Sequence, residues 1–195
     1  MPKRKPSRAE TKLATRAALI EAALEEFARH GLDASLDAIC ARAELTRGAF
    51  YVHFADRDAL IVAVMNHVLG GFVTALTGPR TGIEAAIRLF FAAVQARAPA
   101  VHAGRGLRFY HLMDACHRTP PVGEAYRALI ATGRAQLAQG LASDQAAGRV
   151  RADIAAPALA ELMTALALGV VAMLELELPL DARAAGDTAI ALLRG

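Results

Sequence analysis

The sequence predicts an all-α protein of about nine helices. Apolar residues recur at steps of three and four along most of the 195 residues, which is the spacing of one buried helix face. Proline and glycine separate these segments, and no segment shows the convincing alternation of a half-exposed strand. We expect an N-terminal three-helix domain of the helix-turn-helix type, followed by a larger helical domain.

The composition supports this organisation and indicates the cellular compartment of the protein. A chain that is 55% hydrophobic can bury one domain of about sixty residues and a larger one beside it. Cys40 and Cys116 fall in different predicted domains, so we expect no structural disulfide and a reducing, cytoplasmic location. No secretory signal is visible, and residues 162–174 form an apolar stretch shorter than the roughly 20 residues that span a bilayer. The sequence therefore predicts no membrane partner.

The first predicted helix covers residues 11–30, with Gly31 placed to end it. Its apolar positions step by four, three, four and three, which draws one buried stripe. The stripe consists of Leu13, Ala17, Ile20, Leu24 and Phe27. The opposite side, expected to face solvent, carries Arg16, Glu21, Glu25 and Glu26.

A flexible basic arm is expected at residues 1–10. The first twenty residues hold six Lys or Arg side chains against the single Glu10, while Pro2, Pro6 and Ser7 argue against stable structure before the helix. Such an arm gains affinity for DNA by releasing condensed counterions. The alternative is a tail that serves only solubility, and the overall formal charge of +3 does not decide between them.

Two short helices follow, joined by three or four residues. Ser35 can cap the first, whose apolar residues Leu36, Ile39, Cys40 and Ala43 share one face. The pattern breaks at Glu44, and Thr46 offers a hydroxyl to the free N–H groups of a second helix over residues 47–54. Two helices connected in this way have helix-turn-helix geometry.

The second of these helices has one buried and one exposed face. Phe50 and Phe54 are four residues apart and are expected to face inward. The other side carries Arg47, Gly48, Tyr51 and His53. Glycine costs a helix about 1 kcal/mol relative to alanine, so Gly48 indicates close approach of the backbone to DNA. The alternative is that Gly48 relieves crowding against the preceding helix.

Residues 19–60 resemble the N-terminal domain of the tetracycline-repressor (TetR) family of transcriptional regulators. The resemblance is carried by Ile20, Ala23, Phe27, Gly31, Ile39, Ala43, the run 45–54, Arg57 and Leu60. The family usually has glycine at the position of Glu44 and commonly lysine at the position of Arg57. Because glutamate is uncomfortable in a left-handed turn, we expect the local turn to differ slightly.

The resemblance implies that the second helix is the recognition helix of a double-stranded DNA-binding protein. Arg47 is then the base-reading residue, since its fork matches the two guanine acceptors in the major groove. Tyr51 and His53 are expected at phosphates, as is Arg57, which follows the cap residue Asp56. The complete expected set is Lys3, Arg4, Lys5, Ser35, Thr46, Arg47, Gly48, Tyr51, His53 and Arg57.

The rest of the chain is predicted to form helices separated by helix-breaking proline and glycine residues. The predicted helices cover residues 57–76, 82–97, 101–116, 122–147, 155–178 and 180–193. The expected breakers include Pro99, the pair Pro120 and Pro121, Gly148 and Pro179. We therefore expect a helix-turn-helix domain over residues 11–58 and a helical effector-binding and dimerisation domain over residues 59–195.

The helix over residues 155–178 is apolar nearly all round, so it needs a partner surface. A second copy of the chain can supply it, and the resemblance implies a four-helix contact with the helix ending at Leu193. The expected dimer residues are Leu159, Leu162, Met163, Leu166, Val170, Met173, Leu174 and Leu192. A homodimer predicts an inverted-repeat operator. The alternative is a central helix buried inside a monomer.

Residues 101–118 mix polar and apolar side chains as a ligand cavity does. The expected effector-binding residues are His102, Arg105, Arg108, Phe109, Tyr110, His111, Met113, Asp114 and His117. The resemblance implies a small-molecule effector, of unknown identity, that relieves repression by a signal through the helix over residues 57–76. A ligand does so only if it prefers one placement of the reading domains.

Two other classes of protein are weighed against a regulator. His111, Cys116 and His117 match no strong metal-ligand spacing, so no metal or cofactor is expected. An enzyme could use His111 as base with Asp114 as its orienting group, but no nucleophile motif or phosphate loop accompanies them. A helical protein-interaction adaptor would have no use for Arg47, Gly48, Tyr51 and the basic arm together.

Overall fold

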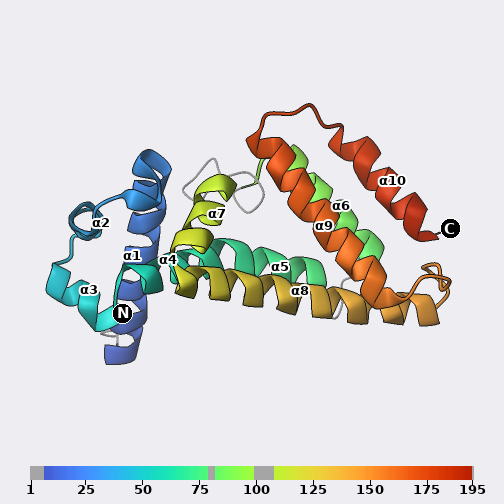
Figure 1. Cartoon of the computed structure of the whole chain (residues 1–195). Coiled ribbons are helices and arrows are strands. Elements are labelled where there is room, and N and C mark those ends of the chain that lie inside the picture. The colour runs from blue at the N-terminus through green and yellow to red at the C-terminus, as the bar shows by residue number, and fades with distance from the viewer. Residues whose placement is uncertain (1–6, 79–81, 99–107, 195) are drawn as a thin grey trace, which may run out of the picture.

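The computed structural model describes residues 7–78, 82–98 and 108–194, and these residues form helices and connections without a strand (Figure 1). The elements are α1 Arg8–His30, the 3-10 turn η1 Gly31–Asp33, α2 Leu36–Arg42, α3 Arg47–His53, α4 Arg57–Met65, the π turn η2 Asn66–Gly70, α5 Gly71–Thr77, α6 Ile83–Gln95, α7 Phe109–Arg118, α8 Pro120–Ala146, α9 Ala156–Glu175 and α10 Ala182–Arg194. Within the described residues, α4, η2 and α5 follow one another without a break. The all-α prediction is confirmed.

The reading domain is formed by α1, α2 and α3 and occupies one end of the molecule (Figure 1). Its core contains fully buried Leu19, Ile39, Phe50 and Leu60, the last contributed by α4. The same core continues into α7 and α8, for example through Val122. The start of α8 is therefore packed against the reading domain.

The first helix differs from the predicted stripe in two ways. Leu13 is 69% exposed and Ala17 is exposed as well, because the first turns of α1 extend past the helices that cover Leu19 and Ile20. Glu26, expected in solvent, is only 5% exposed. Its burial is possible because a guanidinium from α2 pairs with it, as described below.

The second domain is organised around α8, the long helix that contacts α4, α7 and α9 (Figure 1). A second core of buried side chains joins α6, α8, α9 and α10, and includes Phe90, Leu141, Ala160 and Ile190. Helix α10 approaches α6 closely at Gly186, where a Cβ atom would lie 3.1 Å from the Phe91 ring. The start of α1 and the end of α10 lie at opposite ends of the molecule (Figure 1).

The boundaries of several predicted helices shift. Helix α1 begins at Arg8, so residues 8–10, predicted in the flexible arm, are helical, and α9 ends at Glu175 and not near residue 178. Helix α7 begins at Phe109 and runs to Arg118, while the predicted start near residue 101 lies outside the described residues. Pro120 and Pro121, expected to break a helix, instead open α8, since the first helical positions need no N–H donor. Helix α10 starts later, where Asp181 Oδ1 accepts a hydrogen bond from the Ala184 N–H at 2.9 Å.

Two helices of the described chain are apolar and long enough to cross a membrane by length and composition alone, Arg57–Thr77 and Ala156–Glu175. The second contains the apolar stretch of residues 162–174 within a helix of 20 residues. The first supplies Leu60 and Val64 to the core of the reading domain. The second packs along α8, and its apolar side with Leu162 and Leu166 is exposed to solvent in the single chain.

Candidate nucleic-acid interface

Local hydrogen bonds hold the two helices of the helix-turn-helix unit. Ser35 Oγ accepts from the Ala38 N–H at the start of α2, and Thr46 Oγ1 accepts from the Ala49 N–H at the start of α3, both at 3.1 Å. Asp56 Oδ1 caps α4 in the same way, at 2.8 Å from the Ala59 nitrogen. These caps satisfy N–H groups that a helix start leaves free, and they fix where each helix begins.

The turn between α2 and α3 is left-handed at Glu44, whose φ is 56°. The Leu45 N–H donates to the Cys40 carbonyl at 2.9 Å, and the Glu44 N–H donates to the Ala41 carbonyl at 3.1 Å. This hydrogen-bond pair is the usual ending of a helix on a left-handed residue, a position that favours glycine. Glu44 therefore forms this turn at some cost in backbone strain.

The exposed side of α3 carries the predicted reading residues. Thr46, Arg47 and Gly48 are exposed at its N-terminal end, and Tyr51 is 55% exposed one turn later. Phe50 is completely buried and Arg47, Gly48 and Tyr51 are exposed, as predicted, whereas His53, predicted on the outer face, is half-buried. The outer face therefore offers polar groups from a helix that is anchored by an aromatic core residue.

Gly48 is not needed for packing between helices. In the described structure, the atom within 4 Å of an added Cβ is Thr46 Oγ1 at 3.7 Å, an ordinary contact at the start of α3 itself. The alternative that Gly48 relieves crowding against α2 is therefore wrong. Sequence reasoning missed Val52, which is 67% exposed beside Tyr51. The only available signal was its position two residues after Phe50, off the buried face.

Arg47 lies in an ion pair with the preceding helix. Its Nε is 3.1 Å from Asp37 Oδ1, and both side chains are more than half exposed. An exposed pair of this kind contributes little to stability, so the guanidinium can leave Asp37 for another acceptor. The pair holds the Arg47 guanidinium near the N-terminal end of α3.

Other predicted contact residues have partners inside the protein. The Arg57 guanidinium donates to the carbonyls of Ala34, at 2.5 Å, and Leu32. It thereby ties the start of α4 to the α1–α2 connection, which gives Arg57 a structural role. His53 is half-buried, and its Nδ1 is buried without a hydrogen-bond partner among the described residues. Phosphate contacts by these two residues stay predictions, and Lys3, Arg4 and Lys5 lie outside the described residues.

A buried ion pair braces α2 against α1. Arg42 Nε donates to Glu26 Oε1 at 2.5 Å, and another Arg42 nitrogen lies 2.7 Å from Glu25 Oε2. The hydrogen bond to Glu26 is the main cause that raises the pKa of Arg42 above its ordinary value. Sequence reasoning missed this pair because its members are sixteen residues apart. It fixes the angle at which α2 and α3 present Arg47.

The predicted effector residues that the structure describes lie at the junction with the reading domain. A Cβ added at Gly31, where φ is 68°, would lie 3.0 Å from the His111 ring. Arg118 pairs with Asp114 at 2.6 Å on α7 and with Asp33 of η1 at 3.8 Å. Tyr110 and His117 are exposed. Helix α7 thus contacts η1, the turn that follows α1, and an effector role for these residues stays a prediction.

The other predicted effector residues either make no contact with η1 or lie outside the described residues. His102 and Arg105 lie outside the described residues. Arg108 is exposed, with its guanidinium carbon 5.9 Å from the centre of the Tyr110 ring, while Phe109 and Met113 are half-buried. In the described chain, no group of three His, Cys, Asp or Glu side chains is arranged to hold a metal ion.

An apolar cavity of about 90 Å³ lies in the second domain, away from α7. It is open to solvent and is lined by residues of five helices, namely Leu76, Thr77, Ile83, Ala86, Ile87, Phe90, Phe91, Leu137, Met163, Leu166, Ala167 and Ala189. None of these lining residues is charged. Sequence reasoning did not find this cavity, because its walls are spread from α5 to α10.

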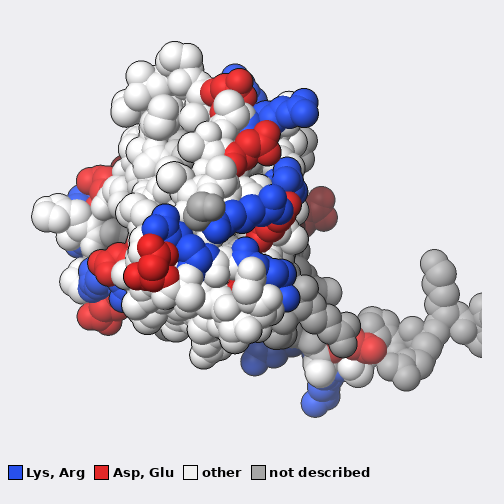
Figure 2. Space-filling view, turned by 90° about the vertical axis from the view of Figure 1, so that its right-hand side faces the viewer, with Lys and Arg blue, Asp and Glu red and all other residues white. Residues whose placement is uncertain are grey.

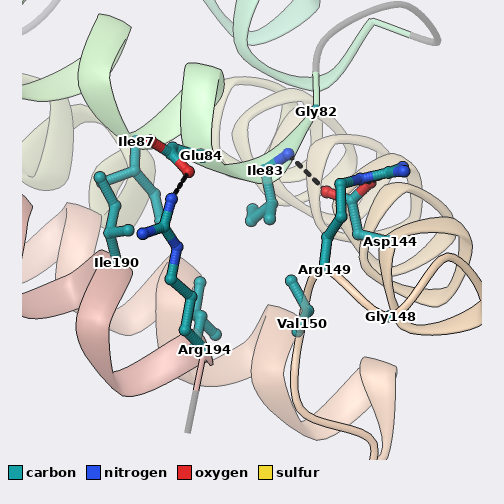
Figure 3. A pocket seen from close by; sticks show the side chains of 11 residues that line it. Gly82, Ile83, Glu84, Ile87, Asp144, Gly148, Arg149, Val150, Ile190 and Arg194 are labelled. Carbon is teal, nitrogen blue, oxygen red and sulfur yellow. Dashed lines mark hydrogen bonds and ion pairs between the residues drawn. The ribbon is translucent and has the colours of Figure 1, made fainter.

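A larger pocket, of about 450 Å³, lies where α6, α8 and α10 meet (Figure 3). Asp144 Oδ2 accepts from the Ile83 N–H at 2.9 Å and so caps α6, while Arg149 pairs with the same carboxylate at 2.5 Å. Glu84 pairs with Arg194 across the pocket (Figure 3). These charges hold the three helices together.

The charged side chains at this end of the molecule alternate in sign. Figure 2 shows positive and negative groups side by side, with no continuous patch of one sign among the described residues in this view. Pairs such as Arg151 with Asp153, at 2.6 Å, account for this pattern.

The predicted dimer residues separate into three groups. Leu162, Leu166 and Leu192 are 58%, 38% and 60% exposed on α9 and α10. Leu159 and Val170 are each only 3% exposed and belong to the core of their own protomer, so their expected place in a dimer contact is corrected. Met163, Met173 and Leu174 are half-buried.

A capped helix-turn-helix unit with an exposed, arginine-bearing recognition helix defines the class of DNA-binding regulators. The model of the family described as bacterial regulatory proteins, tetR family, matches residues 19–64. The HTH-type transcriptional regulator TtgW of Pseudomonas putida is 38% identical over 103 residues, which are 51% of this chain and 72% of TtgW. The chain belongs to the TetR family of transcriptional regulators.

Solved structures agree with this assignment over nearly the whole chain. GusR of Salmonella enterica is 25% identical, with a TM-score of 0.76 over 94% of this chain and 97% of GusR. A SmeT–triclosan complex is 24% identical, with a TM-score of 0.70 over 92% of this chain and 89% of SmeT. The second likeness shows the fold, and its ligand belongs to SmeT.

Proposed function

We propose that the protein is a transcriptional repressor that binds a palindromic operator as a homodimer and is released by a small-molecule effector. The observation that carries the proposal is the outer face of α3, where Arg47 and Gly48 are exposed at the helix start and Tyr51 follows one turn later. In helix-turn-helix proteins the N-terminal residues of the recognition helix contact base edges. A cytoplasmic location follows from this activity.

Each exposed side chain of α3 has a distinct proposed contact. Arg47 is proposed to donate to the O6 and N7 atoms of a guanine. To do so, its guanidinium has to leave Asp37. Val52 is proposed to contact a thymine methyl group, since an exposed apolar side chain gains from that contact. Thr46, Tyr51 and the Nε2 of His53 are proposed at phosphates, with Gly48 allowing the backbone to approach.

The proposed dimer is formed through the exposed side of α9 and α10. Leu162, Leu166 and Leu192 are large apolar side chains that water covers in the single chain, and a second copy would bury them. A two-fold contact places two recognition helices for two half-sites, which predicts an inverted repeat. One chain reads only a few base pairs by itself.

The effector site is proposed at the open apolar cavity lined by α5, α6, α8, α9 and α10. Its wall of Phe90, Phe91, Ile87 and Met163 suits a small uncharged apolar molecule. At about 90 Å³ it fits only a small occupant, unless the flexible Met163 side chain moves. The contacts of α7 with Gly31 and Asp33 offer one route by which a shift in the second domain reaches the reading domain.

Two alternative functions have less support. An adaptor that uses the apolar side of α9 leaves the exposed face of α3 without a purpose. An enzyme centred on His111 and Asp114 is not favoured, because Asp114 is paired with Arg118 at 2.6 Å and the His111 ring lies against Gly31. We propose that the protein has no catalytic activity and needs no cofactor.

The experiment that tests the function is selection of bound sequences from random duplex DNA with the purified full chain. The test variant is Arg47→Ala, and the matched control is Arg134→Ala, which removes the same charge from an exposed position on α8. We expect an enriched palindrome that the control binds normally and the test variant binds about 10- to 100-fold more weakly. No enrichment of any sequence would contradict the proposal.

A further inference from the structure

The pocket where α6, α8 and α10 meet combines an apolar floor with a charged rim (Figure 3). Its volume of about 450 Å³ lies within the size range of small-molecule sites, and it is open to solvent. The floor consists of apolar side chains that are each less than a tenth exposed, namely Ile83, Ile87, Val150, Ile190 and Leu193. The rim carries the charged groups of Glu84, Asp144, Arg149 and Arg194. Such a pocket suits a ligand with an apolar body and one charged end.

The walls of this pocket are held by hydrogen bonds within the protein. Gln145 Nε2 donates to the Arg151 carbonyl at 2.8 Å and to the Ile154 carbonyl at 2.7 Å, which fixes the connection from α8 to α9. The Arg151 N–H donates to the Leu193 carbonyl at 2.8 Å and so ties that connection to the end of α10. A ligand that enters a preformed pocket does not have to order its walls, and this lowers the cost of binding.

One ion pair of the rim is needed for the structure itself. Asp144 is only 4% exposed, and its Oδ2 accepts from the Ile83 N–H at 2.9 Å. Its Oδ1 pairs with Arg149 at 2.5 Å. Removing the partner of a buried charge is strongly destabilising, so we expect Arg149 to stay with Asp144. Arg149 is therefore not the residue that would bind a charged ligand.

The other ion pair of the rim can open. Arg194 contacts Glu84 through one terminal nitrogen, and within the described chain its other guanidinium nitrogens have no hydrogen-bond partner. Glu84 is also held by Arg88, which donates to Oε1 from Nε at 3.1 Å and from Nη2 at 3.0 Å. Glu84 thus keeps a charged partner when Arg194 leaves. Because the Arg194 side chain is 60% exposed, its guanidinium can turn to another acceptor without disturbing the core.

We propose that this pocket is a second small-molecule site, which binds a monocarboxylate with an apolar body. Arg194 holds the carboxylate, because a planar guanidinium can donate two parallel hydrogen bonds to it. The apolar body covers the floor and is thereby removed from water. The site shares Ile83 and Ile87 with the proposed effector cavity, but the lining of that cavity carries no charge. Binding at this second site does not require DNA.

The test measures binding of cyclohexanecarboxylate to the purified full chain by isothermal titration calorimetry. Two comparison molecules separate the contributions: cyclohexanecarboxamide keeps the apolar ring without the charge, and acetate keeps the charge with almost no apolar body. We expect cyclohexanecarboxylate to bind at least about tenfold more tightly than either, since it alone uses both the floor and Arg194. Equal affinity for the carboxylate and the carboxamide would overturn the proposal.

Two variants that break the same ion pair are expected to have opposite effects. Arg194→Gln removes the group that holds the carboxylate and should weaken binding of cyclohexanecarboxylate by about tenfold or more. Glu84→Gln removes the competitor for Arg194 and should strengthen the same binding by about two- to fivefold. A pair that only held α6 and α10 together would give changes of the same sign. Changes of the same sign, or no change in either variant, would overturn the proposal.

The matched control is Arg183→Gln, since Arg183 is an exposed arginine at the other end of α10 and does not line this pocket. It should bind cyclohexanecarboxylate as the wild type does. The Tm of each variant shows whether it is folded, and Arg194→Lys, which keeps the charge without the planar fork, replaces Arg194→Gln if that variant does not fold. Binding that no change at Arg194 or Glu84 affects would place the molecule in the apolar cavity and overturn the second site.

Discussion

Arg47 at the start of α3 is paired with Asp37 of α2, with 3.1 Å between Nε and Oδ1. The same guanidinium is the proposed reader of guanine, and it cannot hold both partners with the same donors. Because both side chains are more than half exposed, the pair itself is weak, within about 1 kcal/mol. Asp37 is therefore a competitor of the operator for Arg47.

Asp37→Asn is expected to raise operator affinity by about two- to fivefold, since it removes that competitor and a negative charge near DNA phosphates. The measurement is an equilibrium binding titration at fixed salt. In an Arg47→Ala background, most of this gain should disappear, because the competition no longer exists. A loss of affinity in Asp37→Asn would show instead that the pair orients Arg47 for reading.

Replacing Lys3, Arg4 and Lys5 by alanine is expected to weaken binding to all DNA sequences alike. Removing one charge that neutralises a phosphate lowers the slope of log affinity against log salt by about 0.9, so the slope should fall by up to roughly 3. The control removes two exposed arginines elsewhere, Arg134 and Arg183. An unchanged slope in the arm variant would support the solubility-tail alternative.

Features that depend on a few neighbouring residues could be predicted from the sequence. Ser35, Thr46 and Asp56 were expected to cap helices, and each accepts the N–H three residues further on. That geometry is decided within one turn of chain. Similarly, the sequence predicts that Phe50 and Phe54 share the buried face, because residues four apart lie on the same side of a helix, and both are buried.

Features that depend on distant segments could not be predicted. Glu26 has the charge of a surface residue, and only Arg42 of another helix makes its burial possible. Leu13 matches the apolar stripe but extends beyond the helices that cover the rest of α1, so it is exposed. The apolar cavity has walls from five helices, and no local pattern marks them as neighbours. Sequence spacing shows which residues share a helix face. Whether that face is buried or exposed depends on the segments that pack against it.

Glu44→Gly is expected to stabilise the protein by about 0.5–1 kcal/mol, because relief of the strain exceeds the entropy that glycine adds to the unfolded chain. In the described part of the chain, helices end with the same hydrogen-bond pair at Glu44, Arg97, Gly148 and Glu177, and of these Gly148 is the residue that a positive φ favours. Urea unfolding of Glu44→Gly and of Glu177→Gly should show similar gains, whereas a gain in neither would mean that both turns are unstrained.

Leu166→Glu is expected to convert the dimer to monomers and to reduce operator affinity strongly. A carboxylate on the exposed side of α9 would have to be buried without a partner in the proposed contact. The control is Leu89→Glu on α6, where the leucine is 43% exposed but lies outside the predicted dimer surface. Light scattering after size exclusion gives the mass. A Leu166→Glu protein that remains dimeric would place the interface elsewhere.

Glu84 makes stability depend on acid pH through the charges that join α6 and α10. Hydrogen bonds from Arg88, at 3.0 Å, and from Arg194 lower the pKa of Glu84 below its ordinary value of 4.5. A carboxyl whose pKa is lower in the folded state stabilises the fold fully above the ordinary value. That contribution is lost as the pH falls from about 4.5 through the lower folded pKa.

The free energy of unfolding of Glu84→Gln should therefore depend less on pH in the acid range than that of the wild type. Near neutral pH the wild type should be the more stable protein. The measurement is the free energy of unfolding in urea at a series of pH values between about 3 and 7. Glu124→Gln, at an exposed position on α8, serves as the control and should follow the wild type. An identical acid dependence in Glu84→Gln would show that the pairs with Arg88 and Arg194 do not persist in solution, because the proton linkage requires them.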